Sequence, residues 1–510
     1  MDEPKIGFYI CNCGTNIAKM VDCDAVAEAA SQLPGVTVAK AYKYMCSNPG
    51  QEMIVQDAKE QGLDRVVVAA CSPRMHEPTF RKALATAGVN QYFLEMANIR
   101  EQCSWVHDDR EAATDKARAL AFAAIKRVAY HEPLERRSVD MCPATLVIGG
   151  GIAGLSAALD LADAGTQVYM VDRQDHLGGN VARVDLTAPY LDSARDMLTE
   201  RITHYGYGKL PNVITSFEFE KMLRRGEVVT KEGKVPQYVA IVHCVGSRSK
   251  EYHPYCSRVC CMTALKYAQE VKSAIPNCYV SDVYIDMHAF GKGHEDFYRR
   301  SSEVKTLFLM FKKNEHPVVR KADPKDDCEM LIEVNEQLSG ELIELPADLI
   351  ILMVGMEAQP DCREVAHLAN ISADKDGWFI ESHPKLDPVA TTTDGVYIAG
   401  ACQAPKDIPD SVAQARAAAA RILAHISRGK LEVDAVYAEV DEDLCSGCRV
   451  CNELCPYTAI EFDEEKHKSH VISALCKACG ACVAACPSSA IKARGFTDEQ
   501  IFAQIEGVLG

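Results

Sequence analysis

The sequence predicts an α/β protein of three domains, and three patterns in its 510 residues support that fold class. An apolar strand near residue 145 leads directly into a glycine-rich turn, as in α/β sheets that bind a dinucleotide. Two cysteine-rich motifs near the end are copies of each other, offset by 31 residues. Short apolar strands near the start end on cysteines. We therefore predict domains at 1–140, 141–430 and 431–510.

Composition excludes several classes of protein. The formal net charge of −17 argues against a nucleic-acid-binding protein. The first residues lack the pattern of a secretory signal, and no uncharged apolar run is long enough to cross a membrane. The 23 cysteines are therefore expected to be reduced rather than paired in disulfides. We expect a soluble, cytoplasmic protein with no transmembrane segment.

Residues 6–103 predict a small α/β domain whose strands end on cysteines. Such cysteines converge at the carboxyl edge of the sheet, where these folds place their ligands. One iron–sulfur cluster needs four ligands, and the sequence offers five candidates without excluding any: Cys11, Cys13, Cys46, Cys71 and Cys103. The alternative is a structural domain without redox activity, because free cysteine is also a common core residue.

The middle domain begins with a dinucleotide-binding pattern. The strand at 145–149 is followed by G-G-G-I-A-G, by a helical run that ends at Gly165, and by a second strand that closes on Asp172. Glycines let the turn approach a pyrophosphate, the helix N-terminus faces the phosphates, and the acid binds the ribose hydroxyls. The predicted cofactor contacts are Gly149, Gly150, Gly151, Ile152, Ala153, Gly154, Asp172 and Arg173.

The choice of FAD over NAD rests on two further segments. Gly178-Gly179-Asn180 resembles the second glycine turn of two-dinucleotide-binding flavoproteins, which have the thioredoxin-reductase-like fold. The run T-T-D-G-V-Y-I-A-G, which ends at Gly400, resembles their late FAD-binding strand. The Asp that usually follows the final Gly is replaced by Ala401-Cys402, so the contacts to the isoalloxazine and ribityl groups are expected to differ. FAD is the predicted dinucleotide.

Cysteines occupy the place where a thioredoxin-reductase-like protein carries its second glycine fingerprint, in a subdomain at about 238–300. The strand Y-V-A-I-V-H leads into four cysteines within 18 residues, namely Cys244, Cys256, Cys260 and Cys261. We predict a 4Fe–4S cluster here, which would exchange single electrons with the flavin. The alternatives are a catalytic dithiol at Cys260 and Cys261, or inert core cysteines.

The last domain carries the repeated motifs C-S-G-C-R-V-C-N-E-L-C-P and C-K-A-C-G-A-C-V-A-A-C-P. This is the spacing of α+β two-cluster ferredoxins, in which the fourth cysteine of each run ligates the other cluster. One predicted 4Fe–4S cluster is held by Cys445, Cys448, Cys451 and Cys486. The other is held by Cys476, Cys479, Cys482 and Cys455. Structural zinc is the alternative, but zinc sites lack this interleaving.

Several blocks resemble the A-type subunits of heterodisulfide reductase, a family of iron–sulfur flavoproteins. They are Y-C-S-R-V-C-C, P-K-D-I-P-D-S-V at 405–412, and the N-terminal blocks M-C-S-N-P-G, A-C-S-P-R-M-H-E and N-I-R-E-Q-C-S-W-V-H. The resemblance implies an oxidoreductase whose FAD splits or merges electron pairs, in complexes of methanogens and related anaerobes. It implies cofactor contacts at Lys406, Ser411 and Val412, and a lysine near the flavin N5, here Lys266. Lys266 could also be a solvated surface lysine.

The same resemblance implies partners: disulfide-reducing B- and C-like subunits, an electron-input module such as a hydrogenase or formate dehydrogenase, ferredoxin, and self-association in the complex. The long family form has a two-cluster ferredoxin domain inserted between the region of Asn212 and the strand before Cys244. Residues 214–237 contain no cysteine, so a short form is predicted, and bifurcation by this chain is an open question. The alternatives are a non-bifurcating relay or assembly subunit, and a stand-alone NAD(P)H-dependent flavin reductase.

Overall fold

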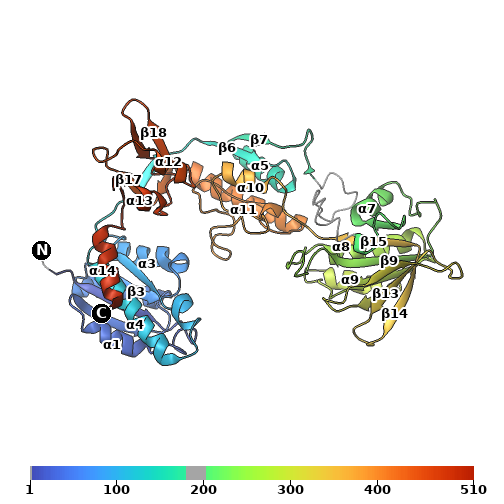
Figure 1. Ribbon diagram of the computed structural model, residues 1–510, viewed down its shortest axis with the longest axis horizontal. Coiled ribbons are helices and arrows are strands. Elements are labelled where there is room, and N and C mark those ends of the chain that lie inside the picture. The colour runs from blue at the N-terminus through green and yellow to red at the C-terminus, as the bar shows by residue number, and fades with distance from the viewer. Residues whose placement is uncertain (1–2, 180–202, 510) are drawn as a thin grey trace. The chain divides into compact units, whose positions relative to one another are not determined.

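The computed structural model describes residues 3–179 and 203–509 (Figure 1). The chain forms two compact units. The terminal unit contains residues 1–140 and 430–510, and the central unit contains residues 141–429. Both are built from sheets and helices, which confirms the α/β fold class. Within the described ranges, no helix combines the length and the apolar character that a membrane span requires.

The first part of the terminal unit is a four-stranded parallel sheet in the order β2-β1-β3-β4. Its central strands are apolar along their whole length because helices cover both faces. The strands are β1 (Ile6–Cys11), β2 (Val36–Tyr42), β3 (Arg65–Ala70) and β4 (Leu94–Asn98). The helices are α1 (Cys23–Ser31), α2 (Asn48–Gln61), α3 (Pro73–Ala87), the π-helix η1 (Arg100–Ser104) and α4 (Arg110–Val128).

The second part of the terminal unit joins the first through a strand pair and a helix pair. Strand β16 (Lys430–Val433) runs antiparallel to β5 (Arg137–Asp140). Helix α14 (Asp498–Leu509) packs so tightly on α4 that a Cβ on Gly507 would lie 2.4 Å from the Ala123 Cα (Figure 1). Between them lie β17 (Ala438–Val440), α12 (Val450–Leu454), β18 (Ile460–Asp463), β19 (Lys468–Val471), α13 (Ala481–Ala485) and β20 (Ile491–Ala493).

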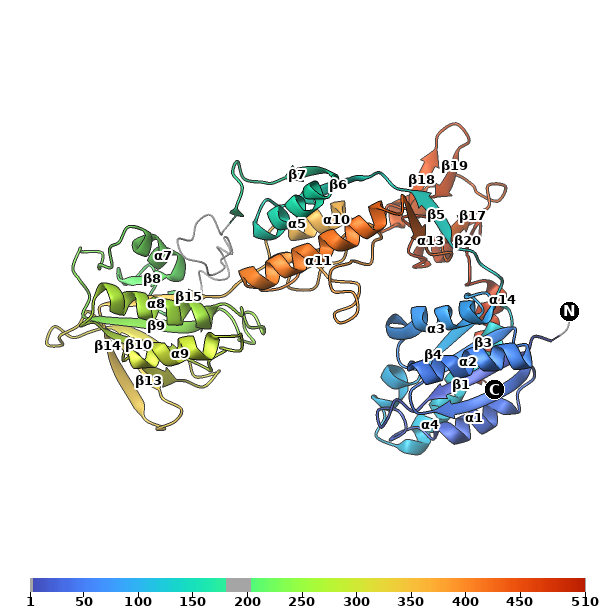
Figure 2. The ribbon, with the colours of Figure 1, turned by 180° about the vertical axis from the view of Figure 1, so that it is seen from behind.

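The flavin-type half of the central unit contains a two-stranded parallel sheet of β6 (Ala144–Ile148) and β7 (Gln167–Val171). Helix α5 (Ile152–Asp163) connects the two strands, and α11 (Ile408–Ile426) lies along α5 (Figure 2). The short helices α10 (Cys362–Leu368) and η3 (Gly400–Cys402) complete the half. Segments more than 200 residues apart in sequence are thereby brought together.

The other half of the central unit is a five-stranded parallel sheet in the order β11-β10-β9-β15-β8. Its strands are β8 (Val213–Thr215), β9 (Tyr238–Val245), β10 (Tyr279–Tyr284), β11 (Leu307–Met310) and β15 (Leu349–Val354). Its helices are α7 (Ser216–Arg224), α8 (Cys260–Ala274) and α9 (His294–Glu303). An antiparallel sheet is formed by β12 (Val318–Lys321), β13 (Met330–Asn335) and β14 (Leu342–Ala347).

Candidate iron–sulfur and flavin sites

The glycine turn after β6 leaves no space for side chains. Gly149 has a φ of +102°, and a Cβ on Gly154 would lie 1.9 Å from the Gly149 carbonyl oxygen. The Asp172 carboxylate at the end of β7 accepts hydrogen bonds from the backbone N–H groups of Gln174 (2.7 Å) and Gly150 (2.5 Å). These two bonds hold the pKa of Asp172 below its ordinary value. A bare turn at a helix N-terminus is the arrangement that admits a pyrophosphate.

The other predicted FAD segments lie against this turn. The Gly178 N–H donates to the Gly150 carbonyl at 2.8 Å, and a Cβ on Gly179 would lie 3.2 Å from the Gly151 Cα. A Cβ on Gly400 would lie 2.7 Å from the Ala153 Cβ. The structure therefore brings both glycine turns and the late segment together. Asn180 lies outside the described residues.

The remaining predicted FAD contacts have partners within the protein. Arg173 is exposed and pairs with Asp361 at 3.1 Å. The Ser411 hydroxyl is buried and donates to the Asp407 carbonyl at 2.7 Å, in the first turn of α11. The Lys406 ammonium donates to the Gln403 side chain at 2.8 Å, and burial lowers its pKa. Ile152 begins α5, and Val412 lies half-buried in α11.

Four cysteines of the central unit meet at the carboxyl end of β9, and we name them the Cys244 site: Cys244, Cys256, Cys260 and Cys261. Burial, followed by the negative charges of Cys261 and Cys256, raises the pKa of Cys244 to about 12. Burial and the other three thiols raise the pKa of Cys260 in the same way. Thiolates are unfavourable in such a place unless cations accompany them. The iron of a 4Fe–4S cluster would supply that charge, so the donor set fits a cluster.

Charged side chains surround the Cys244 site. The Arg248 guanidinium pairs with both carboxylate oxygens of Asp286, at 2.5 and 2.8 Å, and holds the pKa of Asp286 below its ordinary value. His288 lies 2.8 Å from Asp286, and its Nδ1 lies 3.4 Å from the Cys256 Sγ. The Arg258 backbone N–H donates to the same sulfur at 3.3 Å. Sequence reasoning missed these residues because Asp286 and His288 follow β10, and only the sheet order places them beside β9.

Lys266 is neither solvated nor without a partner. Its Nζ donates to both carboxylate oxygens of Glu220 on α7, at 2.9 and 3.2 Å. The two side chains are only 13% and 4% exposed. Its predicted role at the flavin N5 stays a prediction.

The structure brings together four of the five N-terminal cysteines. Cys11, Cys13, Cys46 and Cys71 lie close enough for their charges to affect one another. Burial raises the pKa of Cys71 to about 11, partly offset by Arg100, whose guanidinium lies 3.7 Å from the Cys13 Sγ.

Cys103 lies apart from these four. It is buried in the hydrophobic core between the sheet and α4, whereas Cys11 belongs to the core on the other face of the sheet. The Cys103 thiol donates to the Ala113 carbonyl at 2.8 Å. We therefore infer that the N-terminal cluster would be held by the other four.

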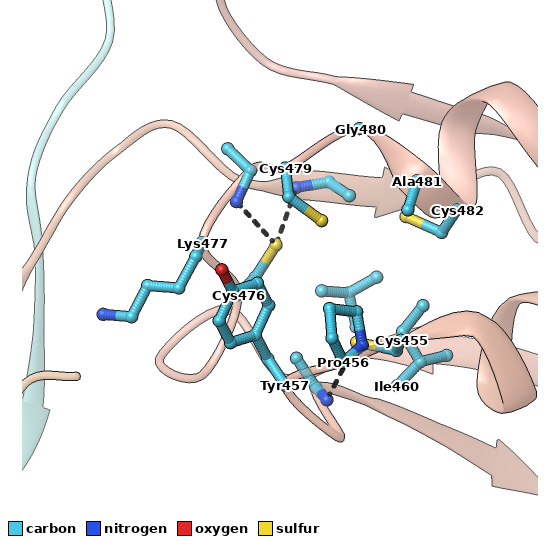
Figure 3. Close-up of a pocket in the computed structure, with 14 residues that line it drawn as sticks. Cys455, Pro456, Tyr457, Ile460, Cys476, Lys477, Cys479, Gly480, Ala481 and Cys482 are labelled. Carbon is cyan, nitrogen blue, oxygen red and sulfur yellow. Dashed lines mark hydrogen bonds between the residues drawn. The ribbon is translucent and has the colours of Figure 1, made fainter. Parts of the chain in front are cut away.

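One cavity in the last part of the chain is lined by a complete predicted ligand set: Cys455, Cys476, Cys479 and Cys482 (Figure 3). The Cys476 sulfur accepts hydrogen bonds from the backbone N–H groups of Ala438 (3.3 Å) and Ala478 (3.4 Å). Burial and the charges of the other three cysteines raise the pKa of Cys482 to about 11. N–H donors aimed at a sulfur are typical surroundings of a cluster ligand.

The second ferredoxin set is more spread out. Cys451 and Cys486 lie in the same apolar core, and the Ala490 N–H donates to the Cys486 Sγ at 3.3 Å. Cys445 is half-buried and Cys448 is exposed in the loop before α12. The described residues contain no group of three or more His, Cys, Asp or Glu side chains that could hold a single metal ion. A four-iron cluster spaces its ligands more widely than one ion does.

Two family models match the chain. A 4Fe–4S dicluster domain matches residues 437–487, and an NAD(P)-binding Rossmann-like domain matches residues 147–197. Among solved structures, the thioredoxin reductase of T. acidophilum matches 55% of this chain and 97% of its own, at 13% identity and a TM-score of 0.34.

Curated relatives match the whole chain, and each is the A-type subunit of its enzyme. That of the H(2):CoB-CoM heterodisulfide,ferredoxin reductase of Methanothermobacter thermautotrophicus is 38% identical over 652 positions, covering 100% of this chain and 98% of the relative. That of the H(2)/formate:CoB-CoM heterodisulfide,ferredoxin reductase of Methanococcus maripaludis is 34% identical over 100% of this chain and 99% of the relative. That of the ferredoxin/F(420)H(2)-dependent CoB-CoM heterodisulfide reductase of Methanosarcina acetivorans is 32% identical over 98% of this chain and 80% of the relative.

The alignment with the first relative also measures what this chain lacks. It has 652 positions, whereas this chain has 510 residues, so at least 142 positions (652 − 510) have no counterpart here. The short form expected from the sequence is therefore confirmed.

Proposed function

The chain belongs to the family of A-type heterodisulfide reductase subunits, and from that premise we propose that it is the FAD- and iron–sulfur-containing electron-transfer subunit of a heterodisulfide-reductase-like complex. It is an oxidoreductase, and the family and the two domain models support FAD and 4Fe–4S clusters as its cofactors. FAD, when bound, supplies the exchange between two-electron and one-electron transfer. The chain's own residues bind these groups and set the route between them.

The observation that carries the proposal is the direct link between the Cys244 site and the FAD segment. Arg258 lies in the loop between Cys256 and Cys260, and its guanidinium pairs with Asp410 at 2.5 Å. Asp410 is in the first turn of α11, one residue before Ser411 and close to Gly400, which meets the glycine turn. A cysteine group at the carboxyl end of a parallel strand occupies the place where such folds bind ligands. We propose that single electrons pass here between FAD and a cluster at the Cys244 site.

The finer proposal concerns the electron partners. We propose that the complex connects a two-electron donor module, B- and C-like subunits that reduce a disulfide, and ferredoxin. The names of the relatives support this, since they include hydrogen, formate, ferredoxin and F(420)H(2) for those proteins. A hydrogenase or formate dehydrogenase module, self-association in the complex and a cytoplasmic location belong to the same proposal.

Electron bifurcation is the favoured mode of action, and a non-bifurcating relay is the second candidate. The relay is favoured by the shortness of the chain, because at least 142 positions of the first relative have no counterpart here. Purified complex separates the two modes. A bifurcating complex reduces ferredoxin only while the disulfide acceptor is present, whereas a relay reduces each acceptor independently.

The electron route is tested by the Cys260→Ser/Cys261→Ser chain. FAD should remain bound because the glycine turn is unchanged, and iron should fall by about four atoms per chain. Stopped-flow absorbance should show that electron exchange between flavin and the ferredoxin clusters falls at least about tenfold, because serine is a poor cluster ligand. Cys278→Ser is the matched control, a buried cysteine outside the site in the same unit. Exchange at the unchanged rate in the double variant would refute the route.

A further inference from the structure

A histidine and an aspartate form a fully buried ion pair behind the Cys244 site. His243 immediately precedes Cys244 on β9, and Asp282 lies on the adjacent parallel strand β10. The His243 Nε2 and the Asp282 Oδ1 are 2.5 Å apart, and both side chains are 0% exposed. Side chains alternate along a strand, so His243 shares a face with Ile241, which packs towards α8.

Stability alone does not explain this pair. The contact is short, yet none of the polar atoms of the two side chains makes an aligned hydrogen bond with any residue that the structure describes. Burying two charges costs several kcal/mol per ion before pairing, and apolar residues of similar volume are often as stable or more stable. Buried polar groups without aligned partners call for an explanation of another kind.

A third group completes the arrangement. The Cys261 thiol, at the start of α8, lies within hydrogen-bonding range of the His243 ring. The imidazole therefore lies between the Asp282 carboxylate and a predicted cluster ligand. Burial by itself would lower the pKa of His243, but Asp282 raises it to about 10, so the ring is held as a double N–H donor.

We propose that Asp282 and His243 are positioning residues that set the reduction potential of the cluster at the Cys244 site. Asp282 fixes the imidazole, and the imidazole directs a hydrogen bond at the Cys261 sulfur. The inference rests on the proposed function, because it requires a cluster there. A single electron enters the cluster from the flavin, and no covalent bond forms or breaks. A donor to a ligand sulfur stabilises the more negative, reduced cluster and so raises its potential.

The test is an EPR-monitored potentiometric titration of the full chain carrying His243→Leu and Asp282→Asn. Removing both partners leaves no lone buried charge, so this variant should fold. The signal of this cluster is the one that disappears in the Cys260→Ser/Cys261→Ser chain. At any fixed potential, the ratio of oxidised to reduced cluster should rise about tenfold, which for one electron is a fall of about 59 mV.

Two further variants sharpen the test. Asp282→Asn alone should give a smaller fall, because the imidazole remains beside Cys261. His131→Leu is the matched control, since His131 is another inward-facing histidine with a carboxylate, Glu95, at 3.3 Å, but it lies in the terminal unit. It should leave this potential unchanged.

The outcomes separate this inference from the proposed function. A loaded cluster with unchanged potential in the double variant would show that the pair is structural and overturn the inference. Loss of this cluster alone would also overturn it, because the pair would then build the site. Absence of the signal from the wild-type chain would refute the proposed cluster and this inference with it.

Discussion

The Cys244 site and the ferredoxin sites hold the same kind of donor set in opposite surroundings. Cys244, Cys260 and Cys261 are 6–7% exposed, between a five-stranded sheet and α8. Cys448 and Cys479 are exposed, in loops of a few residues between short elements. Burial and hydrogen bonds to sulfur set cluster potentials, and exposure lets a partner approach. The difference indicates that the Cys244 site serves the flavin, whereas the ferredoxin sites face other proteins.

The largest expected effect is on thiol reactivity in the iron-free chain. Burial raises the pKa of Cys244 to about 12, so at pH 8 only about one thiol in 10,000 is ionised, and the thiolate is the reactive form. Iodoacetamide should therefore label Cys244 at least about 100-fold more slowly than the exposed Cys448. Mass spectrometry of the labelled peptides measures both rates. In urea the rates should converge; equal rates in the folded chain would contradict the contrast.

A smaller effect separates flavin binding from cluster binding. In Gly154→Val, the new Cβ would lie 1.9 Å from the Gly149 carbonyl and displace the turn. FAD affinity should fall at least about 100-fold, which is about 2.8 kcal/mol, while iron content stays unchanged. Flavin absorbance after gel filtration and iron analysis measure the two quantities. Gly165→Asn is the control, because Gly165 has open space around it at a φ of +82° that Asn tolerates. Retention of FAD by Gly154→Val would contradict the assignment of this turn.

The smallest effect is expected at the N-terminal cysteines. Cys103→Ala should keep the full iron content and cost about 1 kcal/mol in unfolding free energy, because only core packing is lost. Cys71→Ala should lose about four irons, because Cys71 belongs to the group of four. Iron analysis and urea unfolding compare the two. Iron loss from Cys103→Ala would place Cys103 among the ligands.

The comparison also explains what could be predicted from sequence. The ferredoxin ligands follow from spacing alone, because a short motif carries all but one ligand of each cluster. The Cys244 ligands are also close in sequence and could be predicted together. Their surroundings could not, because Asp282, Asp286 and His288 reach β9 only through the order of strands in the sheet.

The N-terminal domain shows the same limit. Strand ends suggested five candidate ligands, but sequence pattern does not say which face of the sheet a loop cysteine reaches. Cys103 follows β4 like a ligand but turns into the core under α4. In the FAD site, the glycine turn was predictable as a local pattern. The contact of Arg258 with Asp410 was not, since 152 residues separate the two.

The antiparallel pair β5–β16 makes the central unit a removable module. Asp140 lies directly opposite Lys430, so the chain leaves the terminal unit and returns to it at one point. An Asn-Gly turn joining these two residues would close the pair as a two-residue hairpin. The resulting chain would keep the N-terminal and ferredoxin cysteines on an uninterrupted scaffold, as a flavin-free electron carrier. Other flavin units could be spliced in at the same point without breaking a strand.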